Sequence, residues 1–222
     1  MENHHALTGP MTQLLARVQD NTNKYLQFFS SQGLAEPSFS HGDGLSPGQP
    51  LPADIQAAKE AALEATDELH HLLLGPMALI ANCAGDQYLM LSVQYIYRYK
   101  LAQHVPVDAE TTFEDMSKAA KVPVTDLTRF LRVAMGRHVF AEPRKGVVVH
   151  IAASRVLLHN SMIEAWLLNI AEEFWLSLSR TVDATQRWPG SEEPNESGYS
   201  LAHNMVDENP FDVIKKDPVW QQ

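Results

Sequence analysis

The middle of the chain carries the local pattern that most restricts its fold. Residues 112–120 favour a short helix with Thr112 as its N-cap, and the Val-Pro-Val run at 122–124 marks a turn. Thr125 is expected to cap a second helix. Residues 140–150 then place a Pro-Arg-Lys-Gly turn between two β-prone runs, which predicts a hairpin. Helix, turn, helix and hairpin in this order predict a winged helix-turn-helix.

Most of the remaining chain shows helical periodicity, because apolar residues recur at three- and four-residue spacing. The dipeptide Gly75-Pro76 interrupts this pattern. The fold class is therefore predicted to be mainly α: a helical dimerisation domain that contains the winged helix-turn-helix and its small β-hairpin. The helices are expected over residues 11–32, 54–74, 77–83, 86–103, 153–159 and 161–187, the last either as one long helix or as a broken one.

Changes in composition divide the chain into three parts. Residues 1–52 are predicted to form an N-terminal helix and a flexible linker, since eleven of the residues at 33–52 are Gly, Pro or Ser. Residues 53–188 are the winged-helix-like dimerisation domain. Residues 189–222 form a polar, irregular connector that ends in the start of a helix at 211–216.

Charge, cysteine content and the distribution of apolar residues argue against a disulfide-stabilised, secreted or membrane-spanning protein. The 222 residues include 27 Asp and Glu against 17 Lys and Arg, a formal net charge of −10. The one cysteine, Cys83, cannot form an intramolecular disulfide, and its apolar helix predicts a buried, inert thiol. The N-terminus has no apolar signal region, and residues 72–83 are too short to span a bilayer. We therefore expect a cytoplasmic protein with no membrane partner.

The winged helix raises the hypothesis of DNA binding, which the charge distribution disfavours. Residues 107–151 sum to only +1, although every other section is net negative. The second helix offers few Asn or Gln side chains that could read bases. We therefore expect no nucleic-acid partner.

Catalytic and metal-binding patterns are also missing from the sequence. The ten histidines include no His-x₃-His or His-Glu-x-x-His spacing, and there is no Gly-x-Ser-x-Gly. The adjacent Glu172 and Glu173 point to different sides of their helix and are not expected to act as an acid–base pair. The sequence predicts no catalytic residue, no cofactor-binding residue and no metal ligand.

One apolar stripe is the candidate functional surface. Met162, Trp166, Ile170 and Phe174 recur every four residues, and Trp175 widens the stripe. The plain interpretation is core packing. The arc is wide for a small domain, however, and large aromatic side chains are typical of subunit interfaces. We therefore predict that these five residues contribute to a dimer interface or line a substrate.

Several segments, in the right order and spacing, carry a family resemblance. Over about residues 55–218 the chain resembles the N-terminal part of fungal secondary-metabolite O-methyltransferases, the plant-type class that depends on S-adenosylmethionine. The matching segments are residues 95–106 (YIYRYKLAQHVP), 127–135 (LTRFLRVAM), 140–143 (FAEP), 150–155 (HIAASR) and 188–202 (WPGSEEPNESGYSLA).

This resemblance implies a two-domain protein. The N-terminal helical domain of the family dimerises and covers the partner's substrate pocket. Its C-terminal domain is a doubly wound α/β fold that binds the methyl donor and supplies a histidine as general base. Nothing here matches that histidine or a strand followed by Gly-x-Gly-x-Gly, and the sequence ends at Gln222. The donor-binding domain is therefore expected to be missing, with S-adenosylmethionine the family's cofactor but not bound by this chain alone.

Three hypotheses about function remain open at this point. The first is a methyltransferase of fungal secondary metabolism by descent, truncated and not catalytic alone. The second is an accessory protein that dimerises, pairs with a related methyltransferase, or binds an aromatic or polyketide-like small molecule. The third and least favoured is a winged-helix DNA binder.

Overall fold

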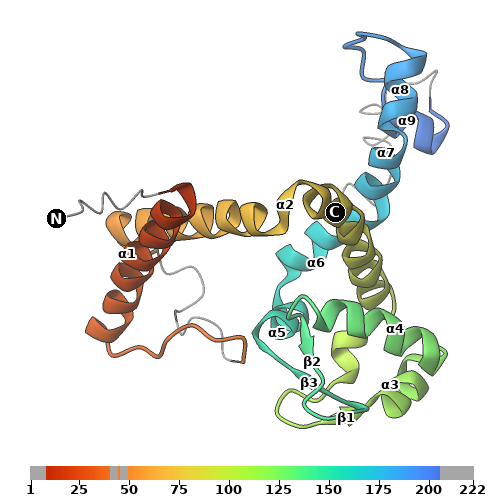
Figure 1. Ribbon diagram of the computed structural model, residues 1–222. Helices are drawn as coiled ribbons and strands as arrows, with labels where there is room; N and C mark the ends of the chain where they lie inside the picture. The colour runs from red at the N-terminus through yellow and green to blue at the C-terminus, as the bar shows by residue number, and fades with distance from the viewer. Residues whose placement is uncertain (1–8, 41–44, 46–49, 206–222) are drawn as a thin grey trace. The chain divides into compact units, whose positions relative to one another are not determined.

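A computed structural model of the protein describes residues 9–40, 45 and 50–205 (Figure 1). The chain divides into two compact units, Met1–Tyr88 with Ile151–Ala153, and Leu89–His150 with Ser154–Gln222. The expected dimerisation domain at 53–188 takes in parts of both units, and the domain boundaries at 52 and 188 stay predictions. The helical start expected at 211–216 lies outside the described residues.

The first unit is built from α1 (Pro10–Ser31) and the beginning of α2 (Ala53–Arg98). The helix predicted over 11–32 is confirmed, and Pro10 stands at its first position, where its fixed φ favours helix and no N–H is needed. Long side chains bridge the two helices. Arg17 Nη2 lies 2.7 Å from Glu64 Oε2, and Lys59 Nζ lies over the Tyr25 ring at 5.8 Å from its centroid.

The helices expected over 54–74, 77–83 and 86–103 form one element with a kink. The interruption predicted at Gly75-Pro76 is confirmed, but the break expected between 83 and 86 is wrong, because α2 continues there. Only Gly75 leaves the helical conformation, at φ 71° and ψ 167°, and Pro76 follows it. The helix also ends earlier than predicted, at Arg98. Lys100 takes a left-handed φ of 48°, and a 3-10 turn, η1 (Leu101–His104), replaces the expected last turn of the helix.

Apolar residues on the stretch of α2 after Gly75 face solvent. Met77 and Ile80 are exposed, and so is Cys83, whose Sγ lies 3.6 Å from the carbonyl oxygen of Leu79. The expectation of a buried thiol is therefore wrong, because the apolar sequence around Cys83 forms surface rather than core. Among the described residues, no helix combines the length and apolar character needed to span a membrane.

In the second unit, α3 (Phe113–Ala120) and α4 (Val124–Met135) occupy the predicted positions. Thr112 caps α3 as expected, since its hydroxyl accepts a hydrogen bond from the Asp115 N–H at 3.1 Å. The prediction that Thr125 caps α4 is wrong. Pro123 is the N-cap, because its carbonyl accepts the first helical hydrogen bond from Leu127 and Thr125 already lies within the first turn.

A small antiparallel sheet lies beside these helices (Figure 1). The predicted hairpin is present as β2 (Phe140–Ala141) and β3 (Val147–His150), paired with Phe140 opposite His150. A third strand, β1 (Thr111–Thr112), was not predicted; it pairs with the other edge of β3 and gives the order β1-β3-β2.

The core of the second unit lies between α3, α4, η1, this sheet and the end of α2. One face of each element is apolar, and the side chains on these faces form a continuous buried cluster. Its members are Ile96, Leu101, Ala102, Val105, Phe113, Met116, Val122, Leu127, Leu131, Ala134, Phe140 and Val148.

A buried histidine joins the sheet to η1. His150 Nε2 lies 3.1 Å from the carbonyl oxygens of both Ala102 and Val105, and its Nδ1 lies 2.9 Å from Ser154 Oγ. Carbonyl oxygens only accept hydrogen bonds, so Nε2 carries a proton and donates it to them. The imidazole therefore donates to two carbonyl groups, of which the Ala102 carbonyl also accepts from the Val105 N–H at 3.3 Å.

A carboxylate fixes the turn of the hairpin. Glu142 accepts two hydrogen bonds from the guanidinium of Arg132 and one from the Gly146 N–H, each at 2.8 Å. These contacts favour the ionised form. The hydrogen bond from Arg132 contributes most, and together they lower the pKa of Glu142 to about 2.

The helix expected over 161–187 is present as a series of shorter segments, which follow α5 (Ala152–His159). The expectation that 190–210 is irregular is wrong in part, because α9 (Gly198–His203) forms there with Ser197 as N-cap. Gly198 allows this helix to approach α7 closely, since a Cβ at this position would lie 2.6 Å from the Ser177 carbonyl oxygen. The segments of the series are α6 (Ser161–Leu168), the π-helical η2 (Asn169–Phe174), α7 (Trp175–Ser179) and α8 (Thr181–Arg187).

Replacing Glu142 by Gln is expected to make stability less dependent on pH. A lowered pKa means that the carboxylate stabilises the fold above its ordinary pKa of 4.5 and that this stabilisation disappears as the pH falls towards 2. E142Q should therefore lower Tm by about 2–5 °C at pH 7 and match the parent near pH 2. Thermal unfolding between pH 7 and pH 2 measures this, with E36Q, which alters an exposed carboxylate, as the control. A constant difference at every pH would contradict the assignment.

Two glycines of α2 are expected to respond in opposite ways to alanine. An alanine Cβ at Gly75 or at Gly85 would have no other group within 4 Å, so steric clashes do not distinguish the two substitutions. Gly75 has a φ and ψ that only glycine adopts readily, and G75A should destabilise the protein by about 1–3 kcal/mol. G85A lies in ordinary helix and should stabilise it by about 0.5–1 kcal/mol. Urea unfolding of both variants tests this, and equal effects would be inconsistent with the observed φ at Gly75.

Candidate functional site

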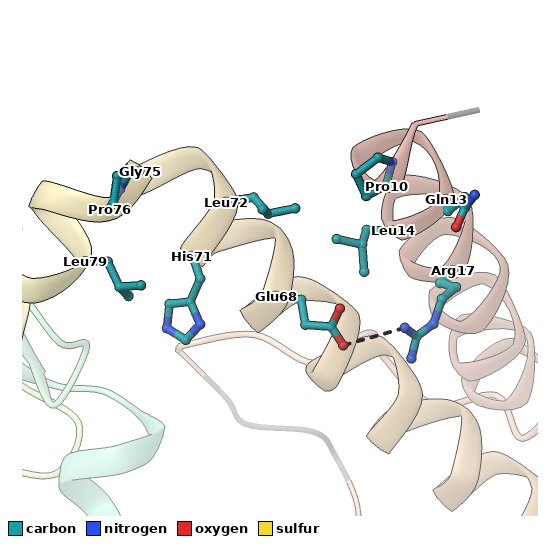
Figure 2. Close-up of a pocket in the computed structure, with 10 residues that line it drawn as sticks. All are labelled: Pro10, Gln13, Leu14, Arg17, Glu68, His71, Leu72, Gly75, Pro76 and Leu79. Atoms are coloured by element: carbon teal, nitrogen blue, oxygen red, sulfur yellow. Dashed lines mark ion pairs between the residues drawn. The ribbon is translucent and has the colours of Figure 1, made fainter. Parts of the chain in front are cut away.

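The first unit contains a cavity of about 650 Å³ between α1 and α2. Figure 2 shows that Leu14 and Leu72 approach each other from the two helices, while Arg17 and Glu68 lie along one side of the cavity. This volume is in the range of small-molecule pockets. Apolar groups form most of its wall, and the lining residues are Pro10, Gln13, Leu14, Arg17, Glu68, His71, Leu72, Gly75, Pro76 and Leu79.

The charged groups of the cavity wall, Arg17 and Glu68, lie beside each other. Arg17 lies 2.7 Å from Glu64 and 3.7 Å from Glu68, so its charge is already shared between two carboxylates. His71 Nδ1 lies 3.7 Å from an oxygen of Asp67. The cavity can therefore hold an apolar ligand and accept hydrogen bonds from it, but Arg17 is not left free to bind an anion.

The second unit carries the predicted apolar stripe on α6, η2 and α7. Met162, Trp166 and Phe174 are 72%, 55% and 56% exposed, whereas Ile170 and Trp175 are half-buried. Core packing therefore does not account for the three exposed side chains. The proposed role of the five residues at a dimer interface or beside a substrate stays a prediction.

The π-helical segment η2 lies in the middle of this stripe, where the sequence pattern predicted α-helix. Both neighbouring glutamates, Glu172 and Glu173, lie within this segment and contact different helices. Glu172 accepts hydrogen bonds from Arg98 near the end of α2, and Glu173 lies 3.2 Å from Nε2 of His203 on α9. These two carboxylates serve different neighbours, in agreement with the expectation that they do not form an acid–base pair.

Other groups that could carry chemistry are dispersed. Within residues 9–40, 45 and 50–205, no three His, Cys, Asp or Glu side chains gather into a possible metal site. Arginines of α4 and of the hairpin turn contact carboxylates. Arg132 pairs with Glu142 and Arg144 with Glu110, each through two nitrogens. The absence of a nucleic-acid partner nevertheless stays a prediction.

No family model matches the chain, but curated proteins do. The chain is 32% identical over 188 residues to the O-methyltransferase PaMT of Phomopsis amygdali, covering 85% of this chain and 43% of that protein. It is 33% identical over 213 residues to the grayanic acid biosynthesis cluster O-methyltransferase of Cladonia grayi, covering 96% and 42%. The homologues are thus fungal O-methyltransferases, including enzymes of secondary-metabolite clusters. The chain spans less than half the length of these relatives.

Solved structures show the same fold. The crystal structure of OxaC superimposes with a TM-score of 0.72 over 93% of this chain and 47% of the OxaC chain, at 15% sequence identity. OxaC has also been solved in complex with SAH and oxaline. At this low identity the likeness concerns the fold alone.

Proposed function

We propose that this chain is the helical, dimerising part of a fungal O-methyltransferase that transfers a methyl group from S-adenosylmethionine to a hydroxyl of a small molecule in secondary metabolism. The observation that carries the proposal is sequence identity of about one third to such enzymes over 85–96% of the chain. The small sheet beside α3 and α4 takes the part of the wing in a winged helix-turn-helix. The protein works in the cytoplasm.

The likeness to OxaC supports the same proposal at the level of fold. OxaC is bound to SAH in one of its structures, and this chain corresponds to 47–48% of its length. This chain covers a similar share of PaMT and of the Cladonia grayi enzyme, 43% and 42%. We assign this chain to the N-terminal half of such a protein, before the donor-binding domain.

The described residues do not fit S-adenosylmethionine. A doubly wound donor site places a helix N-terminus at the carboxyl edge of a parallel sheet. The described part of the chain has one sheet, the antiparallel β1-β3-β2 of short strands. The cavity beside α1 offers no free cation for the donor's carboxylate, because Arg17 is paired with Glu64. We therefore propose that the chain alone neither binds the donor nor catalyses methyl transfer.

The exposed apolar stripe is the part of this chain that serves the enzyme. Met162, Trp166 and Phe174 would otherwise expose large apolar surface to water, which monomeric proteins seldom do. We assign the stripe, together with Ile170 and Trp175, to a surface that meets a second copy, a related methyltransferase or the substrate.

A second candidate function is binding of a small molecule without catalysis. The cavity of about 650 Å³ between α1 and α2 favours it, since it combines apolar walls with hydrogen-bond acceptors. An aromatic or polyketide-like ligand has the matching chemistry. In that case the chain is an accessory protein that pairs with a related methyltransferase, and ligand would bind it without the methyl donor.

The purified chain is expected to show no saturable binding of labelled S-adenosylmethionine at micromolar concentrations. Equilibrium dialysis measures this, with a full-length fungal relative such as PaMT as positive control. Saturable binding to the chain itself would overturn the claim that it cannot hold the donor. Sequencing the transcript beyond codon 222 complements the measurement, because a continuing frame with a glycine-rich strand–loop–helix would supply the donor-binding half.

Charged substitutions on the stripe are expected to prevent self-association. The parent should elute at twice the mass of the chain in size-exclusion chromatography with light scattering. W166D combined with F174D should shift the equilibrium towards monomer by at least tenfold in Kd, because each carboxylate would be desolvated at the interface. V107D, which alters an exposed valine before β1, should leave the dimer intact. If the unsubstituted chain elutes as a monomer, the assignment of the stripe to a dimer interface is wrong.

A further inference from the structure

The apolar stripe has a spacing that an ordinary α-helix cannot keep on one face. Four of its five residues recur every four positions, and four residues of α-helix turn about 40° beyond a full turn. Over the eight residues from Trp166 to Phe174 the excess is about 80°. In a regular α-helix the two rings would therefore point in clearly different directions.

The π-helical segment η2 removes most of this excess. It covers Asn169–Phe174, between the two aromatic residues. Because its hydrogen bonds run from i to i+5, one turn takes about one more residue than in an α-helix. This extra residue returns Phe174 to within roughly 20° of the direction of Trp166. Both side chains are more than half exposed, as expected for neighbours on one outer face.

Side chains from α2 hold this wide turn in place. Gln94 donates a hydrogen bond from Nε2 to the carbonyl oxygen of Ala171 at 2.9 Å. Arg98 donates from Nε to Glu172 Oε1 at 3.1 Å and from its terminal nitrogen to Glu172 Oε2. Gln94 and Arg98 are one turn apart on α2, so they hold two consecutive residues of η2.

A third contact comes from α9 on the next residue of η2. His203 Nε2 lies 3.2 Å from Glu173 Oε2, although the ring is not aligned for a hydrogen bond, and the ring stacks on Tyr199 at 4.2 Å. Ala171 itself is buried. Three consecutive residues of the π-helical segment therefore each have a partner on another element.

We propose that Gln94 and Arg98 are positioning residues: by holding Ala171 and Glu172 in the wide turn, they set Trp166 and Phe174 on one face, where the two rings act together. Without these contacts the segment returns to α-helical geometry and Phe174 rotates away from Trp166. The inference rests on the proposed function only for the role of the face, not for its geometry. It assigns the relative orientation of Trp166 and Phe174 to Gln94 and Arg98, which do not belong to the stripe.

The test reads the relative position of the two rings inside one chain. In a C83S background, F174C is labelled with a bimane, whose fluorescence tryptophan quenches at short range. The quantity compared is the part of the quenching that disappears when Trp166 is replaced by phenylalanine (W166F). This part comes from Trp166 and excludes quenching by Trp175, which is adjacent to the label. The labelled chain is mixed with an excess of unlabelled W166F chain, so that a second copy contributes no Trp166.

Q94A combined with R98A is expected to lower the Trp166-dependent quenching at least twofold. The charge-reversed pair R98E with E172R should restore it, because the ion pair is rebuilt in the opposite sense. R180A is the matched control: it removes the Arg180–Asp183 pair, at 3.0 Å on the same helical run but outside η2, and should leave the quenching unchanged.

Unchanged quenching in Q94A/R98A, with unchanged helix content by circular dichroism, would overturn the proposal. If that variant loses its fold, the charge-reversed pair decides: a folded protein with parental quenching supports the inference, and a folded protein without it refutes it. No step of the measurement involves the methyl donor or dimer formation. Failure here is therefore distinct from failure of the proposed function.

Discussion

The close packing of α4 against its neighbours is the constraint on which the second unit depends. Leu127 and Leu131 are completely buried on its inner face, against side chains of α3, η1 and the sheet. The strands contain only two to four residues, too few for an independently stable sheet. The hairpin therefore exists because Phe140 and Val148 enter this core. The polar contacts of Glu142 and His150 then fix its turn and its end.

Outside this core, large apolar side chains are exposed among the described residues of both units. Met77 and Ile80 are exposed on α2 in the first unit, and Met162, Trp166 and Phe174 are exposed in the second. Exposed apolar groups on this scale favour contact with other molecules.

The sequence predicted the elements whose signals are local. Thr112 caps α3 through its own hydroxyl three residues from the N–H that it binds, and the hairpin forms around the Pro-Arg-Lys-Gly turn. It misplaced the cap of α4, because the carbonyl of Pro123 does what the side chain of Thr125 was expected to do. It also missed α9, whose start depends on Gly198 fitting against Ser177. That contact joins residues 21 positions apart and leaves no periodic pattern.

For the candidate stripe, too, the sequence showed the local features and the fold decided the rest. The four-residue recurrence of Met162, Trp166, Ile170 and Phe174 was visible in the sequence, and its excess over 3.6 residues was the one available sign of a wide turn. The sequence by itself determined the residue types of this surface and the helical class of the chain, because both follow from side-chain chemistry and periodicity. Only the tertiary structure decided that the helix widens at η2 and which residues face outward. These outcomes depend on Gln94 and Arg98, which lie more than 70 positions away along the chain and meet the segment only after folding.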